Sequence, residues 1–313
     1  MKAIVYTGPR ELRYMDLAEP EPGPGEVVVE VRAVGVCGSE LEGVASGSPF
    51  RVPPLVMGHE FAGTRADTGE RVVVNPLVAC LRCDLCLRGQ ANVCRRRAIV
   101  GIQRPGAYAE RVAVPERCCY PAPTGLDWET LALVEPLANA LHAWRLPADR
   151  HPQRVGVVGA GPIGLSCLLV AHSRGTPAVH VADLAAERCA AAGRLGASWT
   201  GPALEGEFDL VMDAVGSAAT RRAAVELARP GGSAVWLGLH GTDPGFDGLA
   251  LIREEKSVLA SFCYTDQDFR AALGLASAID PWWVTSRPLS EGADLFMELM
   301  DGRTDLLKVE FVP

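Results

Sequence analysis

The 313-residue sequence lacks an excess of positive charge, internal repeats and low-complexity segments. Its formal net charge of −8 argues against nucleic acid or an anionic membrane as a partner. An uninterrupted membrane span is also lacking. The longest uncharged stretch, residues 155–173, contains glycines and a proline that favour a strand, a turn and a helix. The apolar run at residues 1–5 is too short for a secretory signal peptide. We therefore expect a cytoplasmic protein that binds neither membrane nor nucleic acid.

Disulfide bonds are not expected among the ten cysteines, because the cytosol keeps thiols reduced. Four of them occupy one short segment with the spacing Cys80-x2-Cys83-x2-Cys86-x7-Cys94. Four thiolates on a compact loop suit a closed, tetrahedral zinc site of the structural kind. Arginines within and beside this loop would offset the negative charge of the thiolates. The spacing therefore predicts a structural zinc lobe over about residues 80–97.

The character of the sequence changes after residue 123. The part before it is rich in Val, Gly and Pro and has short strand-like runs, which is typical of an irregular β domain. A helix is expected over Trp128–Trp144, with Asp127 as its N-cap. Apolar strands then alternate with helices, which indicates a parallel sheet covered on both faces. The strand-like residues 306–312 could rejoin the β domain.

The length is sufficient for about two domains, and the order of the predicted elements places the protein in the α/β class. We place the domain boundaries near residues 147 and 282. Residues 1–147 and 283–313 then form the β-rich domain. Residues 148–282 form the domain with the doubly wound parallel sheet.

A glycine-rich turn lies at residues 159–164, where GAGPIG matches G-x-G-x-x-G. It follows a predicted strand and begins a predicted helix, and Asp183 ends the next predicted strand, a context that predicts a dinucleotide-binding turn. The pyrophosphate would lie on the N–H groups at the start of the helix. The Asp183 carboxylate would bind the ribose hydroxyls and repel a 2′-phosphate, which predicts NAD rather than NADP. Arg188 would either touch the adenosine side or lie on a solvated helix face. The predicted cofactor contacts are Gly159, Gly161, Pro162, Ile163, Gly164, Asp183 and Arg188.

A second candidate metal site is dispersed along the chain. Cys37 directly follows a predicted strand. His59 and Glu60 begin 22 residues further on, and Glu135 lies in the predicted helix. A thiolate, an imidazole and a carboxylate leave one position open on zinc, as a Lewis-acid catalyst requires. Spacing alone does not single out this site, because a lone His beside a Glu is usually structural.

Several motifs occur in a fixed order, namely GVCGS at 35–39, GHE at 58–60, the four-cysteine lobe, GAYAE at 106–110, EPLANALHA at 135–143 and GAGPIG at 159–164. Together they resemble the zinc-dependent medium-chain dehydrogenase/reductase family, in particular its polyol (sorbitol) and threonine dehydrogenase branch, over nearly the whole chain. The resemblance implies a GroES-like catalytic domain, a Rossmann domain and an active site in the cleft between them. It also implies two zinc ions per chain, NAD, a small-molecule alcohol substrate and a homodimer or homotetramer that associates through an edge strand near residues 233–239.

By the same resemblance, Cys37 and His59 look like ligands of the catalytic zinc. Glu60 and Glu135 either ligate this zinc or hydrogen-bond its water, and the sequence leaves that choice open. Ser39 matches a hydroxyl that relays the proton of the alcohol. The predicted catalytic residues are thus Cys37, Ser39, His59, Glu60 and Glu135, and the four-cysteine lobe supplies the ligands of the structural zinc.

Residue 42 departs from the family pattern, which often has a histidine in the proton path at this position. Three interpretations stay open: Glu42 accepts the proton, protons leave directly to water, or Glu42 is a surface residue. His142 lies on the same predicted helix face as Glu135. It is either functional or, as is commoner, a hydrogen-bonded histidine of the core.

The sequence therefore predicts an NAD-dependent zinc alcohol dehydrogenase. Its substrate would be a polar secondary alcohol such as a polyol, a cyclitol or amino-cyclitol, or an amino alcohol. One alternative is an NADP-preferring carbonyl reductase on the same scaffold, against which Asp183 argues. Another is a non-catalytic NAD-binding protein with only the structural zinc filled, against which the presence of every catalytic-site position argues.

Overall fold

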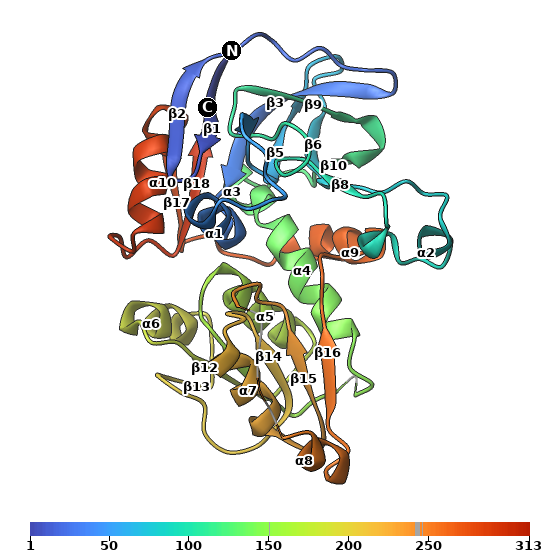
Figure 1. Ribbon diagram of the computed structural model, residues 1–313, viewed down its shortest axis with the longest axis vertical. Coiled ribbons are helices and arrows are strands. Elements are labelled where there is room, and N and C mark those ends of the chain that lie inside the picture. The colour runs from blue at the N-terminus through green and yellow to red at the C-terminus, as the bar shows by residue number, and fades with distance from the viewer. Residues whose placement is uncertain (150, 242–244, 246) are drawn as a thin grey trace. The chain divides into compact units, whose positions relative to one another are not determined.

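The computed structural model describes residues 1–149, 151–241, 245 and 247–313, which divide into two compact units (Figure 1). Unit 1 comprises Met1–Glu135 and Phe269–Pro313, and unit 2 comprises Pro136–Asp268. The chain thus leaves unit 1 within helix α4 (Val134–Arg145) and returns within helix α9 (Asp266–Ala276). Both positions lie earlier along the sequence than the boundaries that we placed at 147 and 282. Among the described helices, none is both long and apolar enough to cross a membrane.

Unit 1 consists mainly of antiparallel strands around a core of valine and aromatic side chains. Its strands are β1 (Lys2–Gly8), β2 (Glu11–Asp16), β3 (Glu26–Gly35), β4 (Leu55–Val56), β5 (Glu60–Arg65), β6 (Arg71–Val74), β7 (Leu77–Val78), β8 (Ala98–Ile99), β9 (Arg111–Pro115), β10 (Cys119–Pro121), β17 (Val284–Pro288) and β18 (Lys308–Val312). Its helices are α1 (Gly38–Ser46), α2 (Asp84–Leu87), α3 (Trp128–Ala132), α9 (Asp266–Ala276, which begins in unit 2) and α10 (Gly292–Met300), with 3-10 turns at Ala91–Val93, Glu116–Cys118 and Leu289–Glu291.

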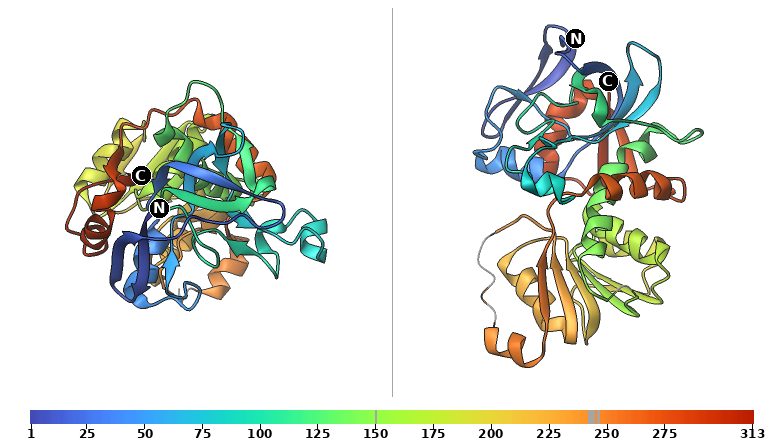
Figure 2. Two further views of the ribbon diagram at one scale, coloured as in Figure 1. Left: turned by 90° about the horizontal axis from the view of Figure 1, so that it is seen from above. Right: turned by 90° about the vertical axis from the view of Figure 1, so that its right-hand side faces the viewer.

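Strand β3 organises the main sheet of unit 1, whose order is β10-β6-β5-β3-β18-β17, with β9 also paired to β3. Its residues alternate between buried and half-exposed over most of its length, as expected for a strand that packs one face on the core. Strand β18 pairs antiparallel with β3, so the prediction that residues 306–312 rejoin the β domain is confirmed. Both ends of the chain therefore lie in this unit (Figure 2).

The single helix expected over Trp128–Trp144 is wrong. The structure has two helices here, α3 and α4 (Val134–Arg145). Pro136 explains the break, because a proline has no N–H and its ring clashes with the carbonyl four residues earlier, which belongs to the last residue of α3. Proline is tolerated in the first turn of α4, where N–H groups have no helical acceptor. Asp127 accepts a hydrogen bond from the Thr130 N–H, which confirms it as the N-cap.

Unit 2 is built around a six-stranded sheet with all strands parallel, in the order β13-β12-β11-β14-β15-β16. Its strands are β11 (Arg154–Val158), β12 (Ala178–Ala182), β13 (Trp199–Gly201), β14 (Phe208–Asp213), β15 (Ala228–Trp236) and β16 (Ser257–Ala260), and its helices are α4, α5 (Pro162–Ser173), α6 (Ala186–Arg194), α7 (Ala218–Leu227) and α8 (Gly248–Arg253). Since crossovers are right-handed and the order reverses between β11 and β14, the sheet is doubly wound. The predicted fold class is confirmed. Strand β15 pairs with β14 on one side and with β16 on the other. The prediction of an edge strand near residues 233–239 is therefore wrong, because β16 is the last strand of the sheet on that side.

Candidate functional site

Strands β3 and β5 bring three potential metal ligands together. One ligand atom each from Cys37, His59 and Glu60 lies within 4.8 Å of the others. Cys37 is the N-cap of α1 just after β3, and His59 immediately precedes β5. The two strands are antiparallel with Gly35 opposite Glu60, so the end of one meets the start of the other. This pairing explains how residues far apart in the sequence form one cluster.

The donor set of this cluster fits zinc, because a thiolate, an imidazole and a carboxylate are its usual protein ligands. His59 and Glu60 are buried, and Cys37 is half-buried. Glu135 is also buried, in the first turn of α4, but it is not among the three residues of the described cluster. The structure thus brings together three of the four residues predicted to surround the catalytic zinc.

Glu40 contacts the Nδ1 side of the His59 ring, a role that was not predicted from the sequence. Its Oε1 atom lies 2.9 Å from Nδ1 of His59 and accepts the Gly58 N–H at 2.9 Å. Its Oε2 atom accepts the Cys37 N–H at 3.2 Å and the hydroxyl of Tyr108. A His59 that donates its Nδ1 proton to Glu40 directs the lone pair of Nε2 toward a metal. The only sequence signal for Glu40 is its place at the third position of a helix, where glutamate often reaches back to the N-cap.

Glu40 is completely buried, and its charged neighbours favour the carboxylate form. Burial by itself raises the pKa of Glu40, but the charge and hydrogen bond of His59, the charge of Arg51 and the Tyr108 hydroxyl together lower it to about 2. Gly58 makes this arrangement possible. Its φ is +94°, and a Cβ there would lie 2.7 Å from a ring carbon of Tyr108. Glycine therefore lets the Tyr108 ring approach the turn in front of His59.

Lys308, on β18, was also missed. Its ammonium group donates to Glu60 Oε2 and, at 3.0 Å, to the carbonyl of Val36, and the side chain is buried. The positive charge of Lys308 offsets the negative charge of Glu60, because a buried carboxylate needs a partner of opposite charge. A side chain at Gly35 would collide with this pair, since its Cβ would lie 2.4 Å from Glu60 Oε2. The only sequence signal is a lysine inside an otherwise apolar strand.

Ser39 lies beside the cluster, in the first turn of α1. Its Oγ atom is 3.3 Å from Sγ of Cys37 and accepts a hydrogen bond of 3.1 Å from Nη2 of Arg51. Glu42 lies one turn further along α1 and is half-buried. The hydroxyl predicted to relay a proton is thus next to the candidate zinc ligand, and Arg51 is a neighbour that the sequence analysis did not foresee.

The four cysteines of the predicted lobe form a second cluster. All four sulfur atoms lie within 4.8 Å of one another. The Cys80–Cys94 and Cys83–Cys86 sulfur pairs are 3.5 Å apart, and the Cys83–Cys94 and Cys80–Cys86 pairs are 3.8 and 3.9 Å apart. A tetrahedron with Zn–S bonds of about 2.3 Å has S···S edges of about 3.8 Å. The four thiols therefore have the spacing of a structural zinc site.

The surroundings of Cys80 favour a thiolate. The N–H of Arg82 donates to Cys80, and together with bonds from neighbouring groups it lowers the pKa of that thiol to about 6. The Arg96 guanidinium also donates to Cys80 Sγ, at 3.5 Å. Arg95, in contrast, pairs with Asp84 on α2. The expected compensation of the thiolate charge thus comes from Arg96, from backbone N–H groups and, at longer range, from Arg95.

The glycine turn of unit 2 joins β11 to α5. Gly159 has a φ of +93°, and a Cβ at Gly164 would lie 1.7 Å from the Gly159 carbonyl oxygen. A Cβ at Gly161, the N-cap of α5, would meet nothing within 4 Å. The backbone is therefore tight where the helix packs on the sheet and open where a pyrophosphate would approach. Pro162 and Ile163 form the first turn of α5. These features fit a dinucleotide.

Asp183 follows β12 and anchors this turn. Its Oδ2 atom accepts the Ala160 N–H at 2.8 Å, and its Oδ1 atom accepts the Ala185 N–H at 2.9 Å. Arg188 is about half-exposed, and its Nη1 atom lies 3.8 Å from Asp183 Oδ2. The carboxylate predicted to select the ribose thus lies directly against the glycine turn, with Arg188 beside it.

His142 is a hydrogen-bonded histidine of the core, which agrees with the commoner of the two interpretations given above. It is buried, and its Nδ1 atom lies 2.9 Å from Oδ2 of Asp268. Arg145 donates to the other carboxylate oxygen at 2.8 Å. The pair links α4 to the start of α9 within unit 2.

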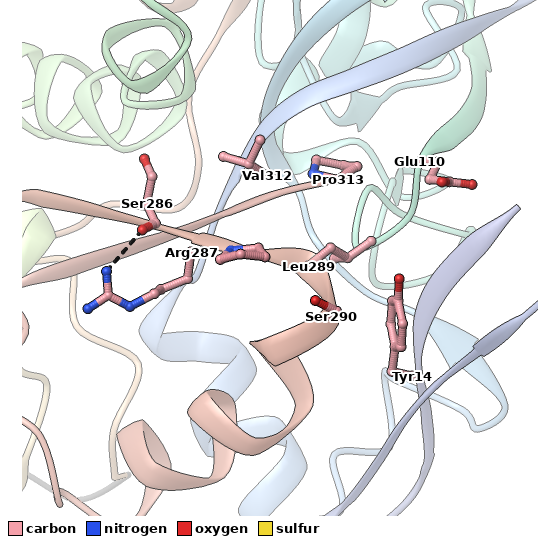
Figure 3. A pocket seen from close by; sticks show the side chains of 9 residues that line it. Tyr14, Glu110, Ser286, Arg287, Leu289, Ser290, Val312 and Pro313 are labelled. Atoms are coloured by element: carbon pink, nitrogen blue, oxygen red, sulfur yellow. Dashed lines mark hydrogen bonds between the residues drawn. The ribbon is translucent and has the colours of Figure 1, made fainter.

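Two surface hollows of unit 1 do not coincide with the metal-ligand clusters. One, of about 390 Å³, lies between Tyr14, Glu110, the Ser286–Ser290 segment and the C-terminal residues (Figure 3). Another, of about 290 Å³, is lined by Pro49, Phe50, Val52, Leu55, Ile102 and Gln103. Because neither is lined by a residue of these clusters, we locate the site by its donor atoms.

Comparisons with known proteins agree with this geometry. The family described as "Alcohol dehydrogenase GroES-like domain" matches residues 23–124, and "Zinc-binding dehydrogenase" matches residues 162–278. The L-galactonate-5-dehydrogenase of Escherichia coli (strain K12) is 32% identical over 291 residues, which cover 86% of this chain and 85% of that protein.

Solved structures are similar over the whole chain. A zinc-binding dehydrogenase of Sinorhizobium meliloti 1021, bound to NADP, has a TM-score of 0.92 and 28% identity, and the match covers 100% of this chain and 99% of that one. An alcohol dehydrogenase of Escherichia coli CFT073, complexed with NADH, has a TM-score of 0.92 and 27% identity with the same coverage. One of these two similar proteins thus binds NADP, and the other binds NADH.

Proposed function

The chain belongs to the zinc-dependent medium-chain dehydrogenase family, and from this premise we propose that it transfers a hydride between a polar secondary alcohol and NAD. The observation that carries the proposal is the cluster of Cys37, His59 and Glu60, with Glu40 bonded to the far side of the imidazole. An imidazole oriented by a carboxylate is the usual arrangement around a zinc ligand. A purely structural histidine would not need a thiol and a second carboxylate beside it.

The reaction divides between the bound groups and the residues of the chain. Zinc would supply Lewis acidity toward the substrate hydroxyl, and the nicotinamide ring would accept the hydride. Ser39, in contact with Cys37 Sγ, is the residue to which we assign the proton of the alcohol. From Ser39 the proton passes to Glu42 or to water. Glu60, paired with Lys308, and Glu135 are the two carboxylates that we assign to the zinc or to its water.

Unit 1 carries the proposed zinc chemistry and unit 2 the proposed dinucleotide site. We assign residues 1–147 and 283–313 to a GroES-like catalytic domain and residues 148–282 to a Rossmann domain. The four-cysteine lobe is the proposed structural zinc site. Asp183 supports NAD over NADP, because its carboxylate would repel a 2′-phosphate at the end of β12. Gly159, Gly161, Pro162, Ile163 and Gly164 are the proposed pyrophosphate contacts, with Arg188 at the adenosine side.

The substrate class follows from the family and from the polar site. The similar galactonate dehydrogenase is named for a sugar acid, which supports a polyol-type substrate with several hydroxyl groups. We further propose a cytoplasmic homodimer or homotetramer. The ten cysteines form no disulfide bond with one another, which supports a reducing compartment. Sedimentation at several protein concentrations measures the assembly.

A screen of NAD reduction tests the function directly. Zinc-loaded protein is incubated with polyols, cyclitols and amino alcohols, each with NAD and with NADP. We expect turnover with at least one polar secondary alcohol and a higher kcat/KM with NAD. Preference for NADP would favour the carbonyl reductase alternative, for which the NADP-bound structure of a similar protein is the specific observation. Absence of turnover with both cofactors would favour a non-catalytic protein.

A further inference from the structure

Arg51 carries a positive charge into the interior beside the proposed catalytic site. The residue is 6% exposed. Its guanidinium lies along α1, since a Cβ at Gly43 would be 2.8 Å from its Nη1 atom and its Nη2 atom bonds Ser39 Oγ. The guanidinium group of an arginine side chain is always charged in proteins. The charge is therefore permanent, and burial makes it costly unless something compensates it.

The compensation available to Arg51 within the chain is incomplete. Its Nε atom is buried and has no hydrogen-bond partner among the described residues. Its Nη2 atom donates to the uncharged hydroxyl of Ser39. Among the described residues, none places a carboxylate oxygen within the 4.0 Å of an ion pair with this guanidinium; Glu40 acts on it only from a greater distance. The fork of an arginine suits two oxygens of one anion.

Ser39 sets the distance between this charge and the reacting alcohol. Its Oγ atom is 3.3 Å from Cys37 Sγ and 3.1 Å from Arg51 Nη2. An alcohol that donates to Ser39 lies about two hydrogen-bond lengths, or about 6 Å, from the guanidinium. One of those lengths is the hydrogen bond between the guanidinium and the oxyanion, which leaves about 3 Å between the alcohol oxygen and the oxyanion, the usual separation of oxygens on neighbouring carbons. The guanidinium is thus within reach of a substituent near the reacting carbon.

We propose that Arg51 is a specificity residue that binds an oxyanion of the substrate, a carboxylate or a phosphate ester, carried on the same carbon chain as the oxidised hydroxyl. The proposal rests on the proposed function, because it assigns the reacting alcohol to Ser39. It narrows the substrate class from polar alcohols in general to anionic polyols. An oxyanion placed there completes the hydrogen bonds and the charge balance that the chain leaves open around Arg51.

The test uses three six-carbon probes that differ in charge: sorbitol, gluconate and sorbitol 6-phosphate. For the zinc-loaded wild-type protein, Arg51→Gln and Arg51→Lys, kcat and KM are measured with NAD, and dissociation constants are measured by calorimetry. Arg13→Gln is the matched control, because Arg13 is exposed on β2 and pairs with Glu11. Melting temperature and zinc content verify that each variant folds.

We expect the wild-type protein to prefer one or both anionic probes, and the preferred probe identifies the carboxylate or the phosphate. Arg51→Gln should weaken the binding of the preferred anionic probe and raise its KM about 10- to 100-fold, as the loss of a charged hydrogen bond predicts, and should affect KM for the uncharged sorbitol by a much smaller factor. Arg51→Lys should recover part of the loss, and Arg13→Gln should resemble the wild type.

Two results overturn the proposal. One is a wild-type protein that binds neither anion better than sorbitol. The other is an Arg51→Gln variant that loses kcat equally with all three probes, which would mean that Arg51 only positions Ser39. If sorbitol is oxidised in either case, the proposed function stands without the inference. If anions bind through Arg51 but none of the probes is oxidised, the binding role stands and the proposed function fails.

Discussion

At the scale of single residues, the Cys37 cluster depends on groups that do not ligate. Glu40 orients His59, Lys308 balances Glu60, and Tyr108 adds a hydrogen bond to Glu40. One ring nitrogen of His59 thus lies against Glu40, and the imidazole also contacts the Cys37 thiol. The three candidate ligands are thus held by buried partners, which is the condition for a preorganised metal site.

Glu40→Gln tests the orienting role. The amide keeps the size of the side chain but loses the negative charge that accepts from His59 and Tyr108. We expect zinc affinity or kcat to fall about 10- to 100-fold, as is typical when such a partner of a zinc ligand is changed. Zinc content after dialysis against a chelator and kcat with added zinc measure the effect. Glu70→Gln, at an exposed turn, is the control; equal behaviour of the two variants would contradict the assignment.

At the scale of elements, sites within one short segment could be predicted from the sequence, whereas contacts between distant segments could not. The cysteine lobe and the glycine turn each lie within one short segment, so spacing and context predicted both. The Glu60–Lys308 pair joins residues 248 apart, and Tyr108 meets Glu40 across 68 residues. The pairing of β3 with β5 and β18 brings the first pair together, and backbone hydrogen bonds between residues 107–108 and residues 57–58 place Tyr108 beside Glu40. The break between α3 and α4 was readable from Pro136 but was not predicted.

Cys83→Ser tests the lobe as a separate element. Removal of one of four thiolates should release the zinc held there, because three remaining ligands no longer close the site. We expect one zinc fewer per chain and a lower melting temperature, with dinucleotide binding retained. Zinc content, a thermal melt and the fluorescence of bound NADH measure these. Cys167→Ser, outside the lobe, is the control for zinc content, and an unchanged metal count in Cys83→Ser would refute the prediction.

Asp183→Ser tests the turn that follows β12. The change removes the charge that would repel a 2′-phosphate and also two acceptors of backbone N–H groups. We expect the ratio of kcat/KM for NAD to that for NADP to fall, with a modest loss of activity overall. Kinetics with both cofactors measure the ratio. An unaltered ratio would mean that Asp183 only fixes the glycine turn.

Asp268→Asn tests the link between α4 and α9 and has a defined pH dependence. Burial raises the pKa of Asp268, but bonds from His142 and Thr265 outweigh it and lower the pKa below 3.8. A carboxyl whose pKa is lowered by folding stabilises the protein above its unfolded pKa, and this stabilisation disappears as the pH falls through the folded value.

We therefore expect Asp268→Asn to cost about 1–3 kcal/mol at pH 7 and less below about pH 4. Thermal melts of the variant and the wild type between pH 3 and pH 7 follow the difference. Asp305→Asn, at an exposed position, should show little difference at any pH. A destabilisation that stays constant down to pH 3 would contradict the role of the charge.

At the scale of the whole molecule, the two proposed zinc sites and the proposed dinucleotide site occupy different parts of the described chain. Unit 1 contains both sulfur-bearing clusters, and unit 2 contains the glycine turn and Asp183. The family comparisons cover nearly the whole chain and agree with this division. The comparisons do not identify the substrate, for which we proposed Arg51 as a specificity residue. The account as a whole therefore depends on whether the Cys37 cluster binds a zinc that turnover requires.

The most direct test measures zinc per chain, NAD-dependent turnover and NADH binding in parallel for the wild type, Cys37→Ser and His59→Ala. The account predicts two zinc ions and turnover in the wild type. Each variant should keep only the zinc of the four-cysteine lobe, bind NADH as before and show no turnover. Retained turnover in both variants, or a wild type in which only the four-cysteine site holds zinc, would contradict the central claim.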